Sequence, residues 1–230
     1  MSKKKIPQCA KCPTAACCPP IGASSMDTNK APDFCPMLNA TETLDQALSE
    51  YEKPEVKEFA RQASIQEFEC YDQTPEGLRT RNPRIVELIQ FSQKMGYKKL
   101  GLAFCTGLAQ EAGIVTAILE KQGFAVVSTR CKIGAVPKEN IGIKPEQKIG
   151  GPTACEPMCN PIAQAKILNS EKVDLAIILG LCMGHDTLFI KYCEAPVTVL
   201  AVKDRVTGHN PLAAIYTSSS FYQRLLNNKL

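Results

Sequence analysis

Cysteine and histidine side chains follow short apolar runs in the C-terminal half of the chain, where they could bind metal or carry redox chemistry. Residues 174–186 show the pattern: Leu175–Leu179 is continuously apolar, Gly180 ends the run, and Cys182 and His185 follow. A short, uninterrupted apolar run is typical of a parallel strand that is buried on both faces. Because open α/β sheets bind ligands at their carboxyl edge, this thiol and this imidazole are expected in a binding crevice.

Three further apolar runs, at residues 100–104, 125–129 and 197–202, also predict strands. Cys105 follows the first, Cys131 follows the second, and Lys203, Arg205 and His209 follow the third. Helical patterns separate several of these runs, including one that begins at Asn160-Pro161. Alternating strands and helices predict parallel pairing with right-handed crossovers. We therefore expect a small, parallel, Rossmann-like sheet with flanking helices.

Four of these cysteines are expected to form one site at the carboxyl edge of the sheet. They are Cys105, Cys131, Cys159 and Cys182, and Cys155 is a fifth candidate. About thirty residues without periodic pattern lie between the second strand and the next helix, and loops beyond roughly 15 residues are uncommon unless they are functional. This loop begins and ends in cysteine, so it is expected to wrap a site. Ligands from four separate loops favour an iron–sulfur cluster over a compact zinc site.

Both histidines of the chain, His185 and His209, fall on the same edge. They could donate protons to a substrate, act as exchangeable ligands, or simply hydrogen-bond the loops. Lys203 and Arg205 would add positive field there, which could stabilise a reduced cluster or attract a small anionic substrate. Solvated loop charge is the alternative, and slightly favoured, interpretation of these two cations.

A second group of cysteines predicts a metal centre near the N-terminus. Cys9, Cys12, Cys17, Cys18 and Cys35 lie there, and the first three have the spacing C-x2-C-x4-C. Two thiolates two residues apart can bind one metal, and a tetrahedral zinc or a four-iron cluster would each accept four thiolates. Adjacent side chains point apart in an extended chain, so only one of Cys17 and Cys18 is expected to be a ligand.

Residues 41–96 have a helical pattern. Thr41 is expected to cap one helix, Pro54 to open a second, and Asn82 and Pro83 to serve as N-cap and first turn of a third. The sequence thus predicts three parts: a cysteine-rich metal-binding segment (1–40), a helical region (41–96) and an α/β domain (97–230). Cys70 is expected to be a bystander and Cys193 to have a structural role.

Composition narrows the class of protein. The chain has 230 residues, twelve cysteines and a formal charge of +4, which is too weak a bias to argue for nucleic acid. No apolar segment approaches the roughly 20 residues of a membrane helix, so a cytoplasmic protein is expected. In a reducing compartment, metal ligation explains twelve cysteines better than disulfides do. No phosphate-binding glycine motif or nucleophile elbow is present.

The chain resembles a family of small cysteine-rich proteins, found largely in anaerobic prokaryotes and labelled as metal-binding proteins or as a domain of unknown function. The resemblance covers nearly the whole chain. It rests on AFCTGL at residues 103–108, CK at 131–132, MCNPIAQAKILN at 158–169, GLCMGHD at 180–186, KDRVTGHNP at 203–211, and the N-terminal cysteines. It implies a zinc-type site at the N-terminus and no specific activity.

The first functional hypothesis is a redox protein with two metal centres, expected as two 4Fe-4S clusters, with zinc as the alternative at the N-terminal site. Electrons would pass between a redox partner protein and the second centre through the N-terminal one, for electron transfer or small-molecule reduction at the second centre. The alternative is a non-enzymatic protein that binds zinc or handles metal. A third hypothesis is a thiol or persulfide enzyme in which Cys182 is the nucleophile beside His185.

Overall fold

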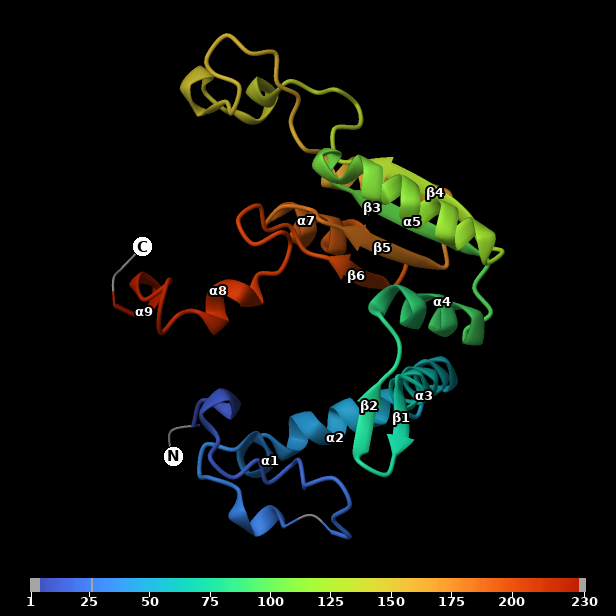
Figure 1. The fold of residues 1–230 in the computed structure, drawn as a ribbon, viewed down its shortest axis with the longest axis vertical. Coiled ribbons are helices and arrows are strands. Elements are labelled where there is room, and N and C mark those ends of the chain that lie inside the picture. Colours follow the sequence, from blue (N-terminus) through green and yellow to red (C-terminus); the bar gives the residue numbers. More distant parts are fainter. Residues whose placement is uncertain (1–4, 26, 228–230) are drawn as a thin grey trace. The chain divides into compact units, whose positions relative to one another are not determined.

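The computed structural model describes residues 5–25 and 27–227. The chain divides into two compact units, Met1–Ile65 and Gln66–Leu230 (Figure 1). The predicted division at residues 40 and 96 rests on cysteine content and periodicity rather than on compactness, and it stays a prediction.

A four-stranded parallel sheet forms the centre of the second unit. Its strands are β3 (Lys99–Phe104), β4 (Ala125–Arg130), β5 (Leu175–Leu179) and β6 (Val197–Ala201). The order across the sheet is β4-β3-β5-β6, and every neighbouring pair is parallel. This parallel sheet confirms the predicted α/β architecture. The prediction succeeded because continuous apolar runs mark the buried strands of a parallel sheet.

The strand order reverses between β3 and β5. The chain runs from β3 outward to β4, and then crosses back past β3 to β5 and β6. Connections that leave in opposite directions separate the loops after β3 and β5 and open a crevice at their carboxyl ends. Phe104 pairs with Leu179, so these two strands end side by side. Cys105 and Cys182 follow these ends.

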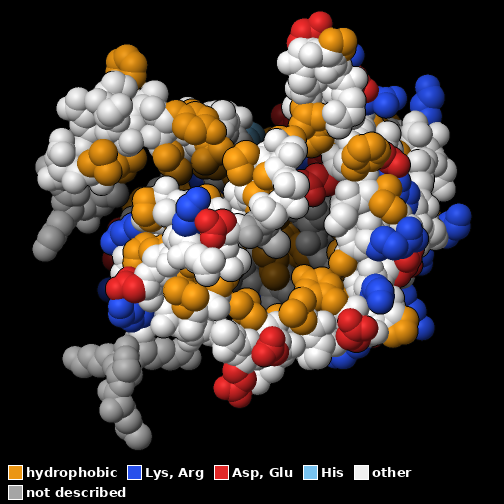
Figure 2. Space-filling model, turned by 90° about the horizontal axis from the view of Figure 1, so that it is seen from below, with side chains coloured by type: hydrophobic (Ala, Val, Ile, Leu, Met, Phe, Trp, Pro, Cys, Tyr) orange, Lys and Arg blue, Asp and Glu red, His pale blue; other side chains and the backbone are white. Residues whose placement is uncertain are grey.

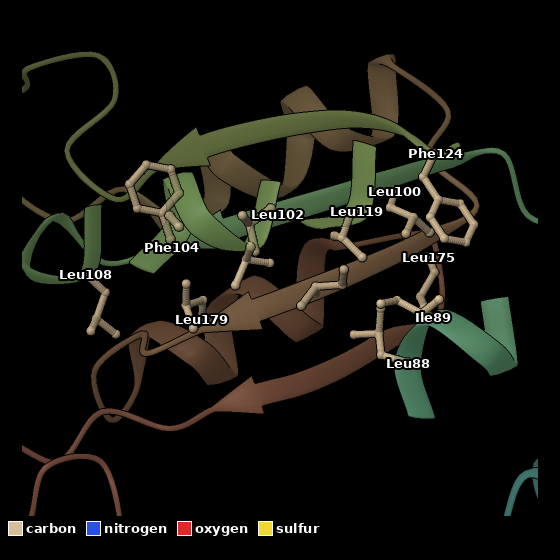
Figure 3. Close-up of a cluster of buried hydrophobic side chains, with 13 residues drawn as sticks. Leu88, Ile89, Leu100, Leu102, Phe104, Leu108, Leu119, Phe124, Leu175 and Leu179 are labelled. Carbon is tan, nitrogen blue, oxygen red and sulfur yellow. The ribbon is translucent and has the colours of Figure 1, made fainter. Parts of the chain in front are cut away.

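Each face of the sheet has its own hydrophobic core. On one face, Leu100, Leu102 and Phe104 pack with side chains of α4 (Arg84–Lys94) and α5 (Ala109–Lys121), as Figure 3 shows. On the other face, the strands pack against α6 (Pro161–Ser170) and α7 (His185–Tyr192), from which Leu168 and Phe189 are fully buried. Alternate strand residues point to opposite faces, so one strand supplies both cores.

Helix α6 begins as the sequence predicts. The Asn160 side chain accepts a hydrogen bond from the Ala163 backbone N–H, and Pro161 occupies the first turn. This arrangement satisfies a free donor of the helix start. The residue before Asn160 is Cys159, so the cap fixes the chain next to a predicted ligand.

The segment before the sheet contains a hairpin that the sequence pattern does not predict. Strands β1 (Tyr71–Thr74) and β2 (Gly77–Thr80) pair antiparallel around a two-residue loop. The prediction for Asn82 is also wrong, because Pro83 is the N-cap residue of α4. The Asn82 amide instead donates hydrogen bonds to the Glu69 carbonyl and to Gln90, so it ties the chain after the hairpin to α4.

The first unit contains short turns followed by helices. Single 3-10 turns lie at Cys9–Lys11 and Thr28–Lys30, and the helices are α1 (Pro36–Asn39), α2 (Thr41–Glu50) and α3 (Pro54–Phe68), the last of which ends in the second unit. Both helices expected after residue 40 are present. However, Ala40 is the N-cap of α2 and no side chain caps this helix, so the predicted capping role of Thr41 is wrong.

Two segments extend from the sheet in Figure 1. The first, residues 132–158 between β4 and α6, is called the arm; it contains 3-10 turns at Lys138–Ile141 and Pro145–Gln147 and projects beyond the carboxyl edge. A bridge between Pro137 and Pro157 closes its base. The second is the C-terminal segment with α8 (Leu212–Tyr216) and α9 (Arg224–Asn227).

The surface carries no single block of one charge on the face drawn in Figure 2, where basic and acidic side chains are interspersed. Within residues 5–25 and 27–227, no helix has the length and apolar character needed to span a bilayer.

Candidate functional site

Three buried or half-buried thiols lie in a row at the carboxyl edge of the sheet. The Sγ atoms of Cys131 and Cys159 are 3.9 Å apart, and Cys105 shares a hydrogen bond with Cys131. The Thr106 backbone N–H also donates to the Cys131 sulfur over 3.2 Å. Cys105 follows β3, Cys131 follows β4, and Cys159 precedes α6, so three separate connections bring these thiols together.

Cys182 adds a fourth thiol from the loop after β5. Its sulfur accepts a hydrogen bond from Arg205 Nη2 over 3.1 Å. Arg205 interacts electrostatically with Cys105 and Cys159 as well, and Cys159 interacts with Cys182. We call Cys105, Cys131, Cys159 and Cys182 the thiol cluster. The structure thus brings the four predicted cysteines to one edge.

The pKa values of Cys105 and Cys159 are shifted in opposite directions. A hydrogen bond with Cys131 and burial raise the pKa of Cys105 to about 12. A hydrogen bond with Cys131 and the positive charge of Lys132 lower the pKa of Cys159 to about 6, against the opposing effect of burial. Without metal, Cys159 is therefore the thiolate of the row.

This division predicts selective alkylation of the metal-free protein. Because the pKa of Cys159 is about 6, its reactive thiolate exists above that pH and is lost below it. We expect iodoacetamide to modify Cys159 with a midpoint near pH 6, measured by peptide mass spectrometry. Burial raises the pKa of Cys193, so Cys193 is the unreactive control. A midpoint for Cys159 in the ordinary cysteine range of about 8.5 would contradict the prediction.

Lys203 lies over the buried end of the cluster. A Cβ atom built on Gly107 would be 3.2 Å from Lys203 Nζ and 4.0 Å from Cys105 Sγ, so the ammonium and the thiol flank the same glycine. Its charge favours the thiolate form of Cys105. The sequence slightly favours solvated loop charge for Lys203 and Arg205, whereas both side chains approach cluster sulfurs.

Gly180 shapes the loop that carries Cys182. Its φ is +67°, and a Cβ atom there would lie 2.1 Å from Leu108 Cδ1. Leu108 is buried beside the end of β3. Only glycine combines this backbone conformation with such a close approach.

The two histidines have different surroundings. His185 is the first residue of α7, and its Nδ1 atom is buried with no hydrogen-bond partner among the described residues. Burial lowers its pKa, and the charge of Lys132 acts in the same direction. It also interacts electrostatically with Cys105, so His185 belongs to the surroundings of the cluster.

His209 stabilises a turn. Its Nδ1 accepts a hydrogen bond from the Asp204 backbone N–H over 3.1 Å, and its own backbone N–H donates to the Asp204 carbonyl. The residue has a positive φ of 69°. These bonds fix the loop that carries Arg205. His209 therefore hydrogen-bonds a loop, which is one of the three roles considered for the histidines.

The remaining cysteine candidate of this half, Cys155, is exposed in the arm, and no described contact joins it to the cluster. The arm does not wrap the site as expected. Its ends are held together by bonds such as Met158 N–H to the Val136 carbonyl and Asn160 N–H to the Cys131 carbonyl. Only these ends reach the thiols, and the rest projects outward (Figure 1).

Two residues that the sequence did not single out support the cluster. Gln164 of α6 is fully buried and donates to the backbone carbonyls of Thr129 and Phe104, near the ends of β4 and β3. Lys132 Nζ donates to the Pro157 carbonyl over 2.6 Å, which holds its charge near Cys159. The sequence signal for Gln164 is a glutamine on an otherwise apolar helix face.

The N-terminal cysteines line a separate pocket of about 180 Å³ in the first unit. Cys9, Cys12, Cys17 and Cys35 contribute to its wall, and Cys18 does not. Hydrogen bonds from the backbone and side chain of Thr14 lower the pKa of Cys12. Between Cys17 and Cys18, which the spacing leaves open, the pocket therefore favours Cys17.

All twelve cysteines are free thiols. Cys70 donates a hydrogen bond to the Gln66 carbonyl, and Cys193 packs on the core beside α7. Within the part of the chain that the structure describes, no group of three or more Cys, His, Asp or Glu side chains is arranged to hold a metal ion as it stands. Binding a metal would therefore have to draw the thiols closer together, as metal binding coupled to folding does.

Fold and site together define a class: a cysteine-rich α/β protein whose parallel sheet carries a group of thiols at its carboxyl edge. The chain belongs to the family described as "Protein of unknown function (DUF1847)", whose model matches residues 35–200. The chain is also 42% identical over 182 residues to the uncharacterized protein MJ0455 of the anaerobic archaeon Methanocaldococcus jannaschii; the match covers 79% of this chain and 87% of that relative. The predicted family resemblance is confirmed.

Proposed function

We propose that this protein is a redox protein with two metal–thiolate centres, the sheet-edge centre being an iron–sulfur cluster held by the thiol cluster. The observation that carries the proposal is the convergence of four thiols at the reversal point of the strand order. Thiolate ligands from several loops suit a cluster seated in a crevice.

The charges around the thiols support this assignment. Four thiolates would place four negative charges at this partly buried edge of the sheet. Lys132, Lys203 and Arg205 approach three of the sulfurs. The Thr106 N–H adds a hydrogen bond to Cys131. Hydrogen bonds to the sulfurs and nearby charge set the reduction potential of a cluster, so these groups would favour its reduced form.

The N-terminal pocket supports the second centre. Its four thiols are Cys9, Cys12, Cys17 and Cys35, which is the ligand number of a four-iron cluster or a structural zinc. In this proposal the protein is cytoplasmic, where twelve free thiols stay reduced, and a redox partner protein exchanges electrons with it. His185, whose Nδ1 has no partner among the described residues, would hold or deliver a proton beside the cluster.

One distance favours a second candidate function, a protein that binds zinc or handles metal. A Zn–S bond of about 2.3 Å places two thiolates of a tetrahedral site roughly 3.8 Å apart. The Cys131 and Cys159 sulfurs are 3.9 Å apart, so this pair already has the spacing of one edge of a zinc site.

Metal analysis separates the two candidates. We expect anaerobically purified protein to contain about eight irons and matching acid-labile sulfide per chain, or about four irons with one zinc, and to absorb visible light. Colourless protein containing zinc without iron would replace the redox proposal with the second candidate. Cys131→Ser should lose the sheet-edge metal in either case, and Cys70→Ser is the matched control that should lose none.

A further inference from the structure

We propose that the thiol cluster takes a small oxyanion as its substrate, held between Lys203 and Arg205 on the Cys182 side of the cluster. The reaction of the anion rests on the proposed redox function of the same site. Binding of the anion can be tested independently of that function. Lys203 and Arg205 would then be binding residues that select negatively charged substrates.

Arg205 brings a fixed cation to the open side of the cluster. It contacts Cys182 through Nη2 only, and it forms no ion pair within the described part of the chain. The other N–H groups of its guanidinium stay available in the planar arrangement that binds oxyanions through two parallel hydrogen bonds. Arginine is also always charged at neutral pH.

Lys203 supplies the second cation two residues earlier. Its ammonium group lies beside Gly107 and Cys105, and no hydrogen bond or ion pair to another described residue occupies it. Lys132 differs in this respect, because its ammonium is bound to the Pro157 carbonyl. Lys203 and Arg205 therefore flank the cluster, one near Cys105 and the other on Cys182, with donors to spare.

The neighbouring carboxylates of Asp204 and Asp186 accept hydrogen bonds from other groups than the two cations. The Asp204 carboxylate accepts the backbone N–H groups of Val206 and Thr207. Asp186 accepts the backbone N–H of Thr187. Both carboxylates therefore accept hydrogen bonds within their own turns and leave the donors of Lys203 and Arg205 unoccupied.

Solvent reaches this side of the site. Met183 follows Cys182 and is 90% exposed, and Val206 follows Arg205 and is 80% exposed. By contrast, Cys105 and Cys131 are 8% and 2% exposed. A small anion can therefore approach from the Cys182 side, whereas Cys105 and Cys131 themselves are buried. His185 lies beside the same cluster, and its buried Nδ1 has no hydrogen-bond partner among the described residues.

Sulfate is the probe for this inference, because it is a small oxyanion that thiols do not reduce. Calorimetric titration of the protein as purified should use sodium chloride of equal ionic strength as the reference, since salt screens exposed charges. We expect saturable sulfate binding that Arg205→Gln and Lys203→Gln each weaken by about tenfold or more. Lys121→Gln is the matched control, because Lys121 ends α5 at the opposite edge of the sheet, and it should bind as the wild type does.

The metal content of the same variants should also be measured, because it distinguishes a failure of this inference from a failure of the proposed function. Arg205→Gln and Lys203→Gln should retain wild-type metal while losing sulfate, which supports a substrate-binding role. Sulfate binding that survives in both variants, or no binding to the wild-type protein, overturns the inference. Wild-type protein without redox metal that still binds sulfate through these two residues would refute the proposed function and retain the oxyanion site.

Discussion

Replacing Cys17 by serine is expected to remove the N-terminal metal, whereas replacing Cys18 by serine should leave it bound. Cys17 lines the same pocket as Cys9, Cys12 and Cys35, and Cys18 does not. Structural zinc sites bind with apparent free energies of about 10–16 kcal/mol at neutral pH, and a serine hydroxyl cannot replace the thiolate charge. The loss of one of four ligands should therefore reduce the metal content by one whole centre.

The pair of variants is its own control, because both remove one exposed thiol from adjacent positions. Metal per chain should be measured for each after identical anaerobic purification. Cys131→Ser completes the comparison, since it should lose the sheet-edge metal and keep the N-terminal one. Equal metal loss in the Cys17 and Cys18 variants would show that the pocket is not the ligand set.

Gly180→Ala is expected to lower the free energy of unfolding by about 3 kcal/mol, because two costs add. The backbone at φ +67° lies in the left-handed region, which costs a residue with a Cβ about 1–2 kcal/mol. The new methyl would also lie 2.1 Å from Leu108 Cδ1, and overpacking of a core costs about 1–3 kcal/mol. Urea unfolding followed by circular dichroism measures the sum.

Gly123→Ala separates the two costs. Gly123 has φ +89°, and no atom lies within 4 Å of a Cβ placed there, so this variant should show the backbone cost alone. The Leu108→Ala, Gly180→Ala double variant should lose less than the sum of the single variants, since removing the leucine relieves the clash. If Gly180→Ala proved no more damaging than Gly123→Ala, the packing argument would fail.

The central strands β3 and β5 were predictable because burial on both faces leaves a local pattern in the sequence. Residues 175–179 are all buried in the structure, and five successive apolar residues bounded by glycine form a pattern that half-exposed strands and amphipathic helices rarely produce. The hairpin left no such trace. Strand β1 is YDQT and β2 is GLRT, and these short, mostly polar strands lack the alternation from which a strand is predicted.

The site was predictable as far as the topology determines it. Parallel strands end at one edge, so Cys105, Cys131 and Cys182 were expected together, and Cys159 followed from its place before a helix start. Which sulfurs come within contact depends on loop paths that no periodic pattern encodes. That is why Arg205 on Cys182 and the exposed position of Cys155 emerge only from the structure.

The helix caps show the same limit. Asn160 caps α6 as expected, but Asn82 bonds across to the chain before the hairpin and Thr41 caps nothing. Propensity favours asparagine and threonine at helix starts by only about 1 kcal/mol. At Asn82, the tertiary hydrogen bonds to Glu69 and Gln90 offset that preference.

The sequence separation between the cysteines of the thiol cluster determines when during folding the cluster can form. Its contacts join residues 25 and 28 positions apart, and its last thiol is Cys182. Each such contact carries the entropy cost of closing a loop, which only the assembled sheet repays. The N-terminal pocket, by contrast, uses thiols up to Cys35. In the proposed function, the first centre would therefore take up metal during synthesis before the sheet has formed, and the second would be filled afterwards, as an insertion into a folded domain.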